Sequence, residues 1–342
     1  MHWILGVVFL RFLEDNLLLD RPFLSGPGER LELAAERQRA YVRLRPMDTD
    51  TDYLLETFSD AAHLSGLAGL YDPGHNPLFR LPLSGDGAIA LLAFFRRQVL
   101  ETGMLVHDFS DLEWNTRFLG DLYQDLSDDA HKRFALLQTP EFVEEWILSR
   151  TLDPAMQEFG ATQVRMIDPT CGSGHFLLGG FARRLAAWQA EAPDMPPAAQ
   201  AQLALNAVAG VDVNPFAVEI ARFRLLLAAL QVGSERRLAA APDFKFSLAI
   251  GDSLFHGTHF FRAELGGARE GFHRHLRYHY KTEDTTALDA ILGRQYHAVV
   301  GNPRISPRRT RPCGTRIGKY SKVAIENTDL ERHSPNGFSI LP

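Results

Sequence analysis

The chain has 342 residues, of which 45% are hydrophobic and 23% charged, and its formal net charge is −6. This composition excludes a disordered or collagen-like chain and is typical of a soluble globular protein with room for more than one domain. Two cysteines are too few for a disulfide framework, and no cluster of cysteines and histidines has metal-ligand spacing, so we expect no metal site.

The apolar run at residues 3–10 is too short to span a bilayer and has no basic leader before it. We therefore expect a cytoplasmic protein with no membrane partner. The negative net charge is unfavourable for binding duplex DNA, which usually requires a basic surface.

Residues 1–126 are predicted to form a helical domain. Apolar residues recur at helical spacing over 10–19, 52–67 and 88–100, and prolines and glycines separate these stretches. One stretch is basic, with Arg37, Arg39, Arg43 and Arg45. These arginines either contact phosphate or form a solvated helix face, and the spacing favours the solvated face.

Residues 127–303 are predicted to form an α/β domain. Short apolar segments at 164–167, 207–211, 246–250 and 297–301 alternate with helical stretches, which predicts four parallel strands covered by helices on both faces. Within the last long helix, Arg222 and Arg224 stand among apolar residues, and we expect their side chains to extend to solvent.

A glycine-rich loop follows the first strand, with the sequence Asp168-Pro169-Thr170-Cys171-Gly172-Ser173-Gly174. Glycines let a backbone approach a ligand closely, and the helix that follows offers unpaired N–H groups to an anionic group. The alternative interpretation is an ordinary turn between strand and helix.

Acids and an Asn-Pro pair end the other three strands. Asp212 follows the second strand and Asp252 the third, and a carboxylate at this place can accept ribose hydroxyls. A turn carboxylate is the alternative for Asp252, and a cap of the next helix for Asp212, although Asn214 could supply that cap. Asn302-Pro303 ends the fourth strand. Upstream, Thr139 is predicted to cap a helix that begins with Pro140.

The segments DPTCGSGHFL, GVDVNP, GDSL and VVGNP, in this order, resemble the motifs of adenine-specific DNA methyltransferases that use S-adenosylmethionine. The resemblance is strongest to the methyltransferases of phage-growth-limitation (BREX-type) defence systems, and it runs from about residue 8 to residue 303. It implies a helical N-terminal region followed by a truncated Rossmann-like methyltransferase sheet. It also implies double-stranded DNA as the substrate and other phage-defence proteins as further partners.

The resemblance also implies a role for each motif. Gly172 and Gly174 would admit the amino-acid part of S-adenosylmethionine, and Asp168 would accept a hydrogen bond from its ammonium group. Asp212 would bind the ribose hydroxyls and Asp252 the adenine amino group, while Thr139 and Phe142 would lie against the methionine part. At the reaction centre, Asn302 and Pro303 would accept the two hydrogens of the amino group of a flipped adenine.

One departure from the family pattern follows Pro303. The family has Asn-Pro-Pro followed by an aromatic residue, whereas this chain continues with Arg304-Ile305, and residues 304–323 contain seven basic residues and no acid. This segment is either a basic nucleic-acid arm or the product of a shifted reading frame. If one base were lost between Asn302 and Arg304, the restored frame would read NPPYITPKDKALRDAYR, which is similar to the family's continuation.

We favour the shifted frame, and three expectations follow from it. Residues 304–342 form an aberrant, poorly ordered tail. The strand near residues 298–300 lies at an open sheet edge, which promotes aggregation. The chain binds cofactor weakly and has little or no turnover.

Three other functions are considered. A protein-glutamine methyltransferase also uses an Asn-Pro-Pro-Tyr motif, and a catalytically dead cofactor- or partner-binding module of the defence complex would lack turnover. A nicotinamide-dependent dehydrogenase is disfavoured because DPTCGSG is not a GxGxxG pattern.

Overall fold

The computed structural model describes residues 2–303 except for 117, 121–138, 234–236 and 255–282. The described residues all belong to one compact unit. The expected aberrant tail lies outside the described residues, and so does the predicted domain boundary at residue 126, which stays a prediction.

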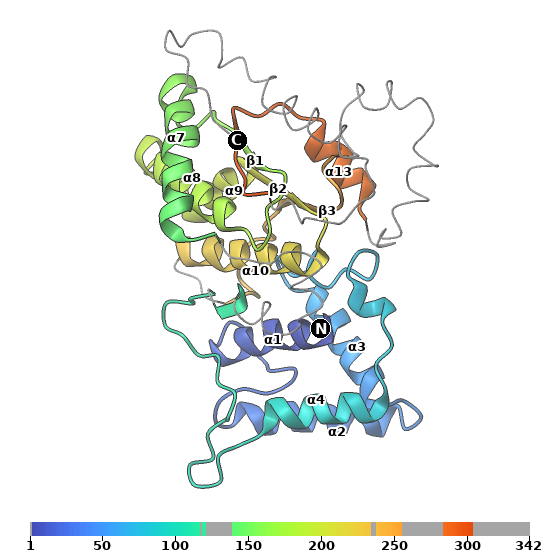
Figure 1. Cartoon of the computed structure of the whole chain (residues 1–342). Coiled ribbons are helices and arrows are strands. Elements are labelled where there is room, and N and C mark those ends of the chain that lie inside the picture. The colour runs from blue at the N-terminus through green and yellow to red at the C-terminus, as the bar shows by residue number, and fades with distance from the viewer. Residues whose placement is uncertain (1, 117, 121–138, 234–236, 255–282, 304–342) are drawn as a thin grey trace, which may run out of the picture. The chain divides into compact units, whose positions relative to one another are not determined.

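The N-terminal region is helical (Figure 1). Its elements are α1 (His2–Asp15), α2 (Arg30–Leu44), α3 (Asp50–Ala62), the 3-10 helix η1 (Pro77–Arg80) and α4 (Gly85–Arg96). The prediction of a first helix over 10–19 is wrong, because α1 begins at His2 and ends at Asp15. Thirteen of its residues are buried, so apolar side chains surround the helix and the helical period is hidden.

A buried network of charged side chains on α1 holds the surrounding loops. The Glu14 carboxylate accepts hydrogen bonds from the backbone N–H groups of Phe23 and Leu24, each at 2.6 Å, and of Ser25 at 3.0 Å. Arg11 Nη2 donates to Asp15 Oδ2 at 2.9 Å and to the His107 carbonyl at 2.9 Å. Burial raises the pKa of Glu14 to about 7, against the opposing effect of these N–H groups and of Arg11.

The second half of the described chain alternates helices and strands. Its elements are α7 (Glu141–Phe159), β1 (Met166–Asp168), α8 (His175–Glu191), α9 (Pro197–Asn206), β2 (Val208–Asp212), α10 (Pro215–Val232), β3 (Ser247–Ile250), α13 (Thr285–Leu292) and β4 (Ala298–Val299). The four strands are parallel and lie in the order β3-β2-β1-β4. The chain therefore moves from β1 outward to β3 and returns to the other side of β1, which creates a topological switch point between β1 and β4.

Side chains alternate between the two faces of the sheet. Met166, Val208 and Leu248 join the large core that includes residues of α8 and α10. Ile167, Ala209, Val211 and Ala249 pack instead with Leu288 and Ile291 of α13. The sheet is thus covered by helices on both faces, and the predicted α/β fold with a Rossmann-like sheet of four strands is confirmed for the described residues.

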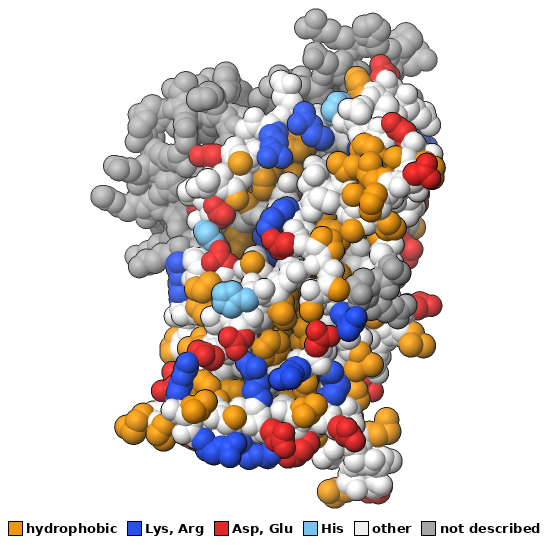
Figure 2. All heavy atoms as spheres, turned by 180° about the vertical axis from the view of Figure 1, so that it is seen from behind, with side chains coloured by type: hydrophobic (Ala, Val, Ile, Leu, Met, Phe, Trp, Pro, Cys, Tyr) orange, Lys and Arg blue, Asp and Glu red, His pale blue; other side chains and the backbone are white. Residues whose placement is uncertain are grey.

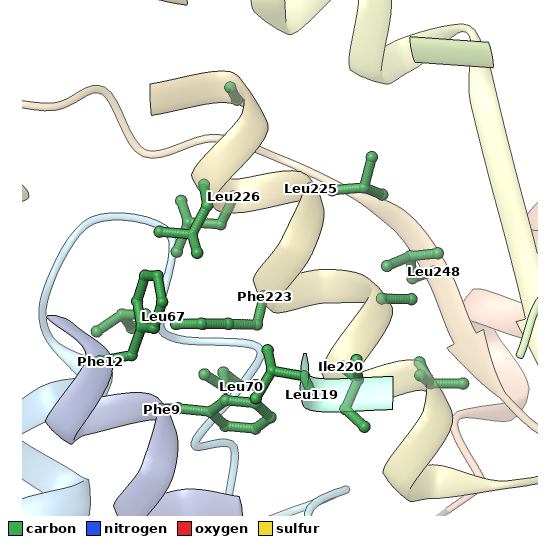
Figure 3. Close-up of a cluster of buried hydrophobic side chains, with 14 of the residues drawn as sticks. Phe9, Phe12, Leu67, Leu70, Leu119, Ile220, Phe223, Leu225, Leu226 and Leu248 are labelled. Atoms are coloured by element: carbon green, nitrogen blue, oxygen red, sulfur yellow. The ribbon is translucent and has the colours of Figure 1, made fainter. Parts of the chain in front are cut away.

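In the large core, α10 packs against both the sheet and the N-terminal helices. Its residue Phe223 is fully buried and stacks on Phe9 of α1, with ring centroids 4.7 Å apart, and meets Phe12 edge to face at 5.7 Å. Figure 3 shows these three rings together with Leu119 and Ile220. The N-terminal helices and the sheet therefore share one hydrophobic core.

The strand β4 lies at a sheet edge, as predicted. Within the part of the chain that the structure describes, it pairs with β1 alone, and Val299 is 47% exposed. Among these residues no helix is long and apolar enough to cross a membrane, and no group of three or more metal-ligating side chains is found. The histidines of segment 255–282 lie outside the description.

The shared core predicts a large effect of Phe223→Ala. Loss of a fully buried phenylalanine should lower the free energy of unfolding by about 3–5 kcal/mol. Urea unfolding, followed by circular dichroism, measures this change. Phe142→Ala is the matched control, since Phe142 is 75% exposed and its loss should change stability by less than about 0.5 kcal/mol. Equal effects of the two substitutions would show that α10 does not join the two parts.

Candidate functional site

The loop between β1 and α8 is a tight turn. The backbone N–H of Gly174 donates to the Cys171 carbonyl at 2.9 Å, and the N–H of Cys171 donates to Val211 of β2 at 2.9 Å. Gly172 has φ +51° and Gly174 has φ +85°, a left-handed conformation that favours glycine. Both glycines of the sequence motif are thus required by the backbone of this turn.

The surroundings of the two glycines differ. A Cβ on Gly172 would meet no atom within 4 Å, so the loop is open on this side. A Cβ on Gly174 would lie 2.9 Å from Cβ of Ala221, because α10 packs directly beneath. Gly172 therefore borders the space in which a ligand can lie, whereas Gly174 serves the contact between the loop and α10.

Asp168 ends β1 and is 1% exposed. Its Oδ1 accepts hydrogen bonds from the backbone N–H of Thr170 at 3.0 Å and from Thr170 Oγ1 at 3.4 Å. Burial raises the pKa of Asp168 to about 7, and the nearby charge of Asp212 adds to this effect. A positively charged ligand beside Asp168 would therefore stabilise the ionised form of its carboxyl group.

Asp212 ends β2 and connects two loops. Its Oδ2 accepts a hydrogen bond from the backbone N–H of Gly172 at 2.9 Å, and its Oδ1 accepts one from the N–H of Asn214 at 2.8 Å. The cap of α10 is Asn214, as the sequence allowed, since its side chain accepts from the N–H of Phe216 at 3.2 Å. Burial raises the pKa of Asp212, and the Asp252 carboxylate raises it further.

Asp252 follows β3, and its Oδ1 accepts a hydrogen bond from the N–H of Leu254 at 2.9 Å. The pairing of Asp168 with Gly210 and of Asp212 with Ile250 places the carboxyl ends of β1, β2 and β3 side by side. Three carboxylates from separate motifs thus follow one edge of the sheet, next to the open side of the glycine loop.

The Asn-Pro pair reaches the same edge from β4. A Cβ on Gly301 would lie 3.0 Å from both Asp168 Oδ1 and Thr170 Oγ1, so the chain passes closely over the end of β1. Asn302 is exposed, and its Nδ2 lies 3.5 Å from Thr139 Oγ1, at the outer limit of a hydrogen bond. Pro303 is the last residue described here, and Arg304 and Ile305 lie beyond it.

The predicted cap of α7 is wrong in one detail. The helix begins at Glu141 with Pro140 as its N-cap, and no side chain caps it. Thr139 instead faces Asn302, and Phe142 lies exposed on the first turn of the helix. A threonine before a proline looks like a helix cap in the sequence, and only the approach of β4 shows its other contact.

The prediction that the two arginines of α10 extend to solvent is wrong. Arg224 is 9% exposed, and its Nη1 donates to the Ser173 carbonyl at 2.9 Å. Arg222 Nη2 donates to the Leu248 carbonyl at 3.2 Å. Arg224, Thr170 and Gly301 are parts of this site that the sequence did not indicate. The only available signal was that Thr170 and Gly301 stand inside recognised motifs.

The basic stretch of α2 forms ion pairs, in agreement with the solvated face that the sequence favoured. Arg37 pairs with Asp60, Arg39 with Glu32 and Arg45 with Glu56. Figure 2 shows basic and acidic side chains interspersed on the visible surface. These paired guanidinium groups are less available to phosphate than unpaired ones would be.

Comparison with known proteins shows similarity to DNA methyltransferases. Residues 152–249, which run from α7 into β3, match the family model of the DNA-methyltransferase domain of MmeI. In a match 316 positions long that covers 88% of the chain, the chain is 46% identical to the adenine-specific methyltransferase PglX of Streptomyces coelicolor. The resemblance to adenine-specific methyltransferases is confirmed. Over most of its length the chain is therefore similar to this methyltransferase.

A second relative is more distant. The chain is 21% identical, over 72% of its length, to a putative type II restriction enzyme and methyltransferase of Methanocaldococcus jannaschii. The chain spans about a quarter of the length of both curated relatives, 26% in each case. Because the match to PglX covers 88% of the chain, it includes residues of the helical N-terminal region as well as of the sheet.

The packing of Gly174 predicts the effect of Gly174→Ala. The left-handed conformation should cost about 1–2 kcal/mol, and the contact with Ala221 should add about 1–3 kcal/mol. Gly28→Ala is the matched control, because Gly28 has φ +59° and open space around it, so only the conformational cost applies. Chemical unfolding of both variants measures the difference. Equal losses would contradict a close contact between the loop and α10.

The raised pKa of Asp168 predicts how stability depends on pH. Between the ordinary pKa of 3.8 and about 7, folded Asp168 keeps a proton that the unfolded chain releases. The stability that Asp168 contributes is therefore complete below pH 4 and is lost as the pH rises to 7. Asp168→Asn removes this titration.

Urea unfolding of the wild-type chain and of Asp168→Asn, at a series of pH values, measures this effect. The difference in unfolding free energy, wild type minus variant, should fall from pH 4 to pH 7 and then stay constant. A difference that grows with pH would contradict the burial of this carboxyl group.

Proposed function

We propose that the chain binds S-adenosylmethionine at the carboxyl ends of β1, β2 and β3, and that it is part of an enzyme that methylates the N6 amino group of adenine in double-stranded DNA. The observation that carries this proposal is the row of Asp168, Asp212 and Asp252 beside the open glycine loop, with Asn302 at the same edge. Ligands of open α/β sheets bind in this position, next to the switch point.

Two features of the described residues support this cofactor. Gly172 leaves open space above the loop, where a side chain would otherwise project. Asp168 and Asp212 have raised pKa values, and both would be stabilised by a cationic ligand. When bound, the cofactor supplies a methyl group activated on a sulfonium centre. Asp168 would bind its ammonium group, Asp212 its ribose hydroxyls and Asp252 its adenine amino group.

Asn302 and Pro303 are the proposed groups at the reaction centre. Because Nδ2 of Asn302 faces Thr139, the carboxamide oxygen of Asn302 points away from this contact. This oxygen can accept a hydrogen bond from the adenine amino group. The Pro303 carbonyl would accept the other hydrogen. These two contacts favour a tetrahedral nitrogen, whose lone pair is then available to attack.

Turnover by this chain is proposed to be low. Arg304 and Ile305 stand where the family has a second proline and an aromatic ring, so no ring stacks on the flipped base at that place. This observation favours a second candidate function, in which the chain is a catalytically inactive module that binds cofactor or a partner. The role in phage defence, with other defence proteins as partners, extends the resemblance to PglX-like proteins.

DNA is favoured over protein glutamine as the substrate. The matching family model describes a DNA-methyltransferase domain, and one relative carries the name of a restriction enzyme and methyltransferase. An assay with radiolabelled S-adenosylmethionine on duplex DNA and on glutamine-containing protein separates these substrates. Methyl transfer to glutamine alone would contradict the proposal.

Cofactor binding tests the site directly. Asp252→Asn keeps an oxygen for the N–H of Leu254 but places an amide NH2 group where the adenine amino group would donate. This substitution should therefore weaken the binding of S-adenosylmethionine about tenfold, or by about 1.4 kcal/mol. Isothermal titration with S-adenosylmethionine measures this change. Asp194→Asn, in the exposed link between α8 and α9, is the control and should bind as the wild type does. A wild-type chain with no measurable binding would refute the proposal.

A further inference from the structure

One face of α10 supports the glycine loop from below. Ala221 and Arg224 are three residues apart on this helix and therefore lie on the same side. Ala221 fits under Gly174, which has no Cβ in the way, and the Arg224 guanidinium reaches the adjacent Ser173 carbonyl at 2.9 Å. The helix thus contacts two successive residues of the loop.

Three of the hydrogen bonds of this loop involve residues 172–174 and bear on its conformation. The N–H of Gly172 donates to Asp212, the N–H of Gly174 donates to the Cys171 carbonyl, and the Ser173 carbonyl accepts from Arg224. The first joins the loop to β2 and the second closes the turn. Only the third comes from a charged side chain of α10, and it sets the direction of the peptide group between Ser173 and Gly174.

Arg224 also contacts the N-terminal region. Its Nε donates to Thr116 Oγ1 at 3.2 Å, and Gln231 Nε2 donates to the Glu113 carbonyl at 2.6 Å. Leu119 lies beside Ile220 (Figure 3). Glu113, Thr116 and Leu119 thus meet α10 in the reverse of its chain direction, and Arg224 connects Thr116 to the glycine loop.

We propose that Arg224 is a positioning residue for cofactor binding: it holds the Ser173–Gly174 peptide of the glycine loop in its binding conformation and makes that conformation depend on Thr116 of the N-terminal region. This inference rests on the proposed binding of S-adenosylmethionine. It assigns a role to the N-terminal helical region, which supports the cofactor loop through Thr116.

The chemistry of arginine suits this position. A guanidinium group has several N–H donors in fixed directions, so it can serve Ser173 and Thr116 at once, whereas the single ammonium of lysine cannot match both directions. Its charge is partly balanced by Glu144 of α7. Burial raises the pKa of Glu144 to about 7, and the charge of Arg224 opposes that rise.

Binding measurements on matched variants test the inference. Arg224→Met should weaken the binding of S-adenosylmethionine about tenfold, and Arg224→Lys should restore part of that loss. Thr116→Val removes only the contact with the N-terminal region and should have an intermediate effect. Arg222→Met is the control, because Arg222 lies on the same helix and donates to the backbone of β3 instead of the loop. It should lose stability but keep its affinity within about twofold.

Hydrogen exchange gives a second measurement that needs no ligand. In Arg224→Met the amides of Gly172 and Gly174 should exchange faster, while the amides of β1 and β2 keep their protection. Unchanged exchange at these two glycines, or an equal increase at all amides, would overturn the inference. A wild-type chain that binds no cofactor would refute the proposed function instead, and the exchange result would still decide the role of Arg224.

Discussion

The burial of α10 on all sides is the constraint on which the rest of the structure depends. On one side its residue Phe223 packs with the rings of α1, and on another Ala221 lies directly under Gly174 of the glycine loop. The helix thus faces the N-terminal helices and the sheet at the same time. Since both parts share its surface, neither can be packed independently of the other, and the position of the glycine loop depends on both.

The acidic edge of the sheet shows how stability and binding compete. Burial raises the pKa of Asp168 and Asp212, and in each case a neighbouring carboxylate raises it further. Such carboxyl groups are costly to ionise without a positive partner, and perturbed pKa values of this kind are common at functional sites. A cationic ligand, such as the proposed S-adenosylmethionine, would relieve this cost.

Structural and functional interpretations of one residue need not exclude each other. Asp212 accepts hydrogen bonds from the N–H groups of Gly172 and Asn214, so it organises two loops, and its carboxylate still has lone pairs for a ligand. Thr139 likewise precedes a helix and also faces Asn302, a residue 163 positions away along the chain. The helix cap expected of Thr139 does not form, and the contacts of both residues depend on parts of the chain that are distant in the sequence.

The sequence by itself determined the class of fold, the four strands and the order of the motifs. Each buried parallel strand is a short apolar run, and each ends in glycine, aspartate or asparagine, so both signals are local. Tertiary structure alone decided the true start of α1 and the groups that the Arg222 and Arg224 side chains contact. It also separated the roles of Gly172 and Gly174, which share a positive φ but face open space and Ala221, respectively. These features depend on residues distant along the chain, and no local pattern records such contacts.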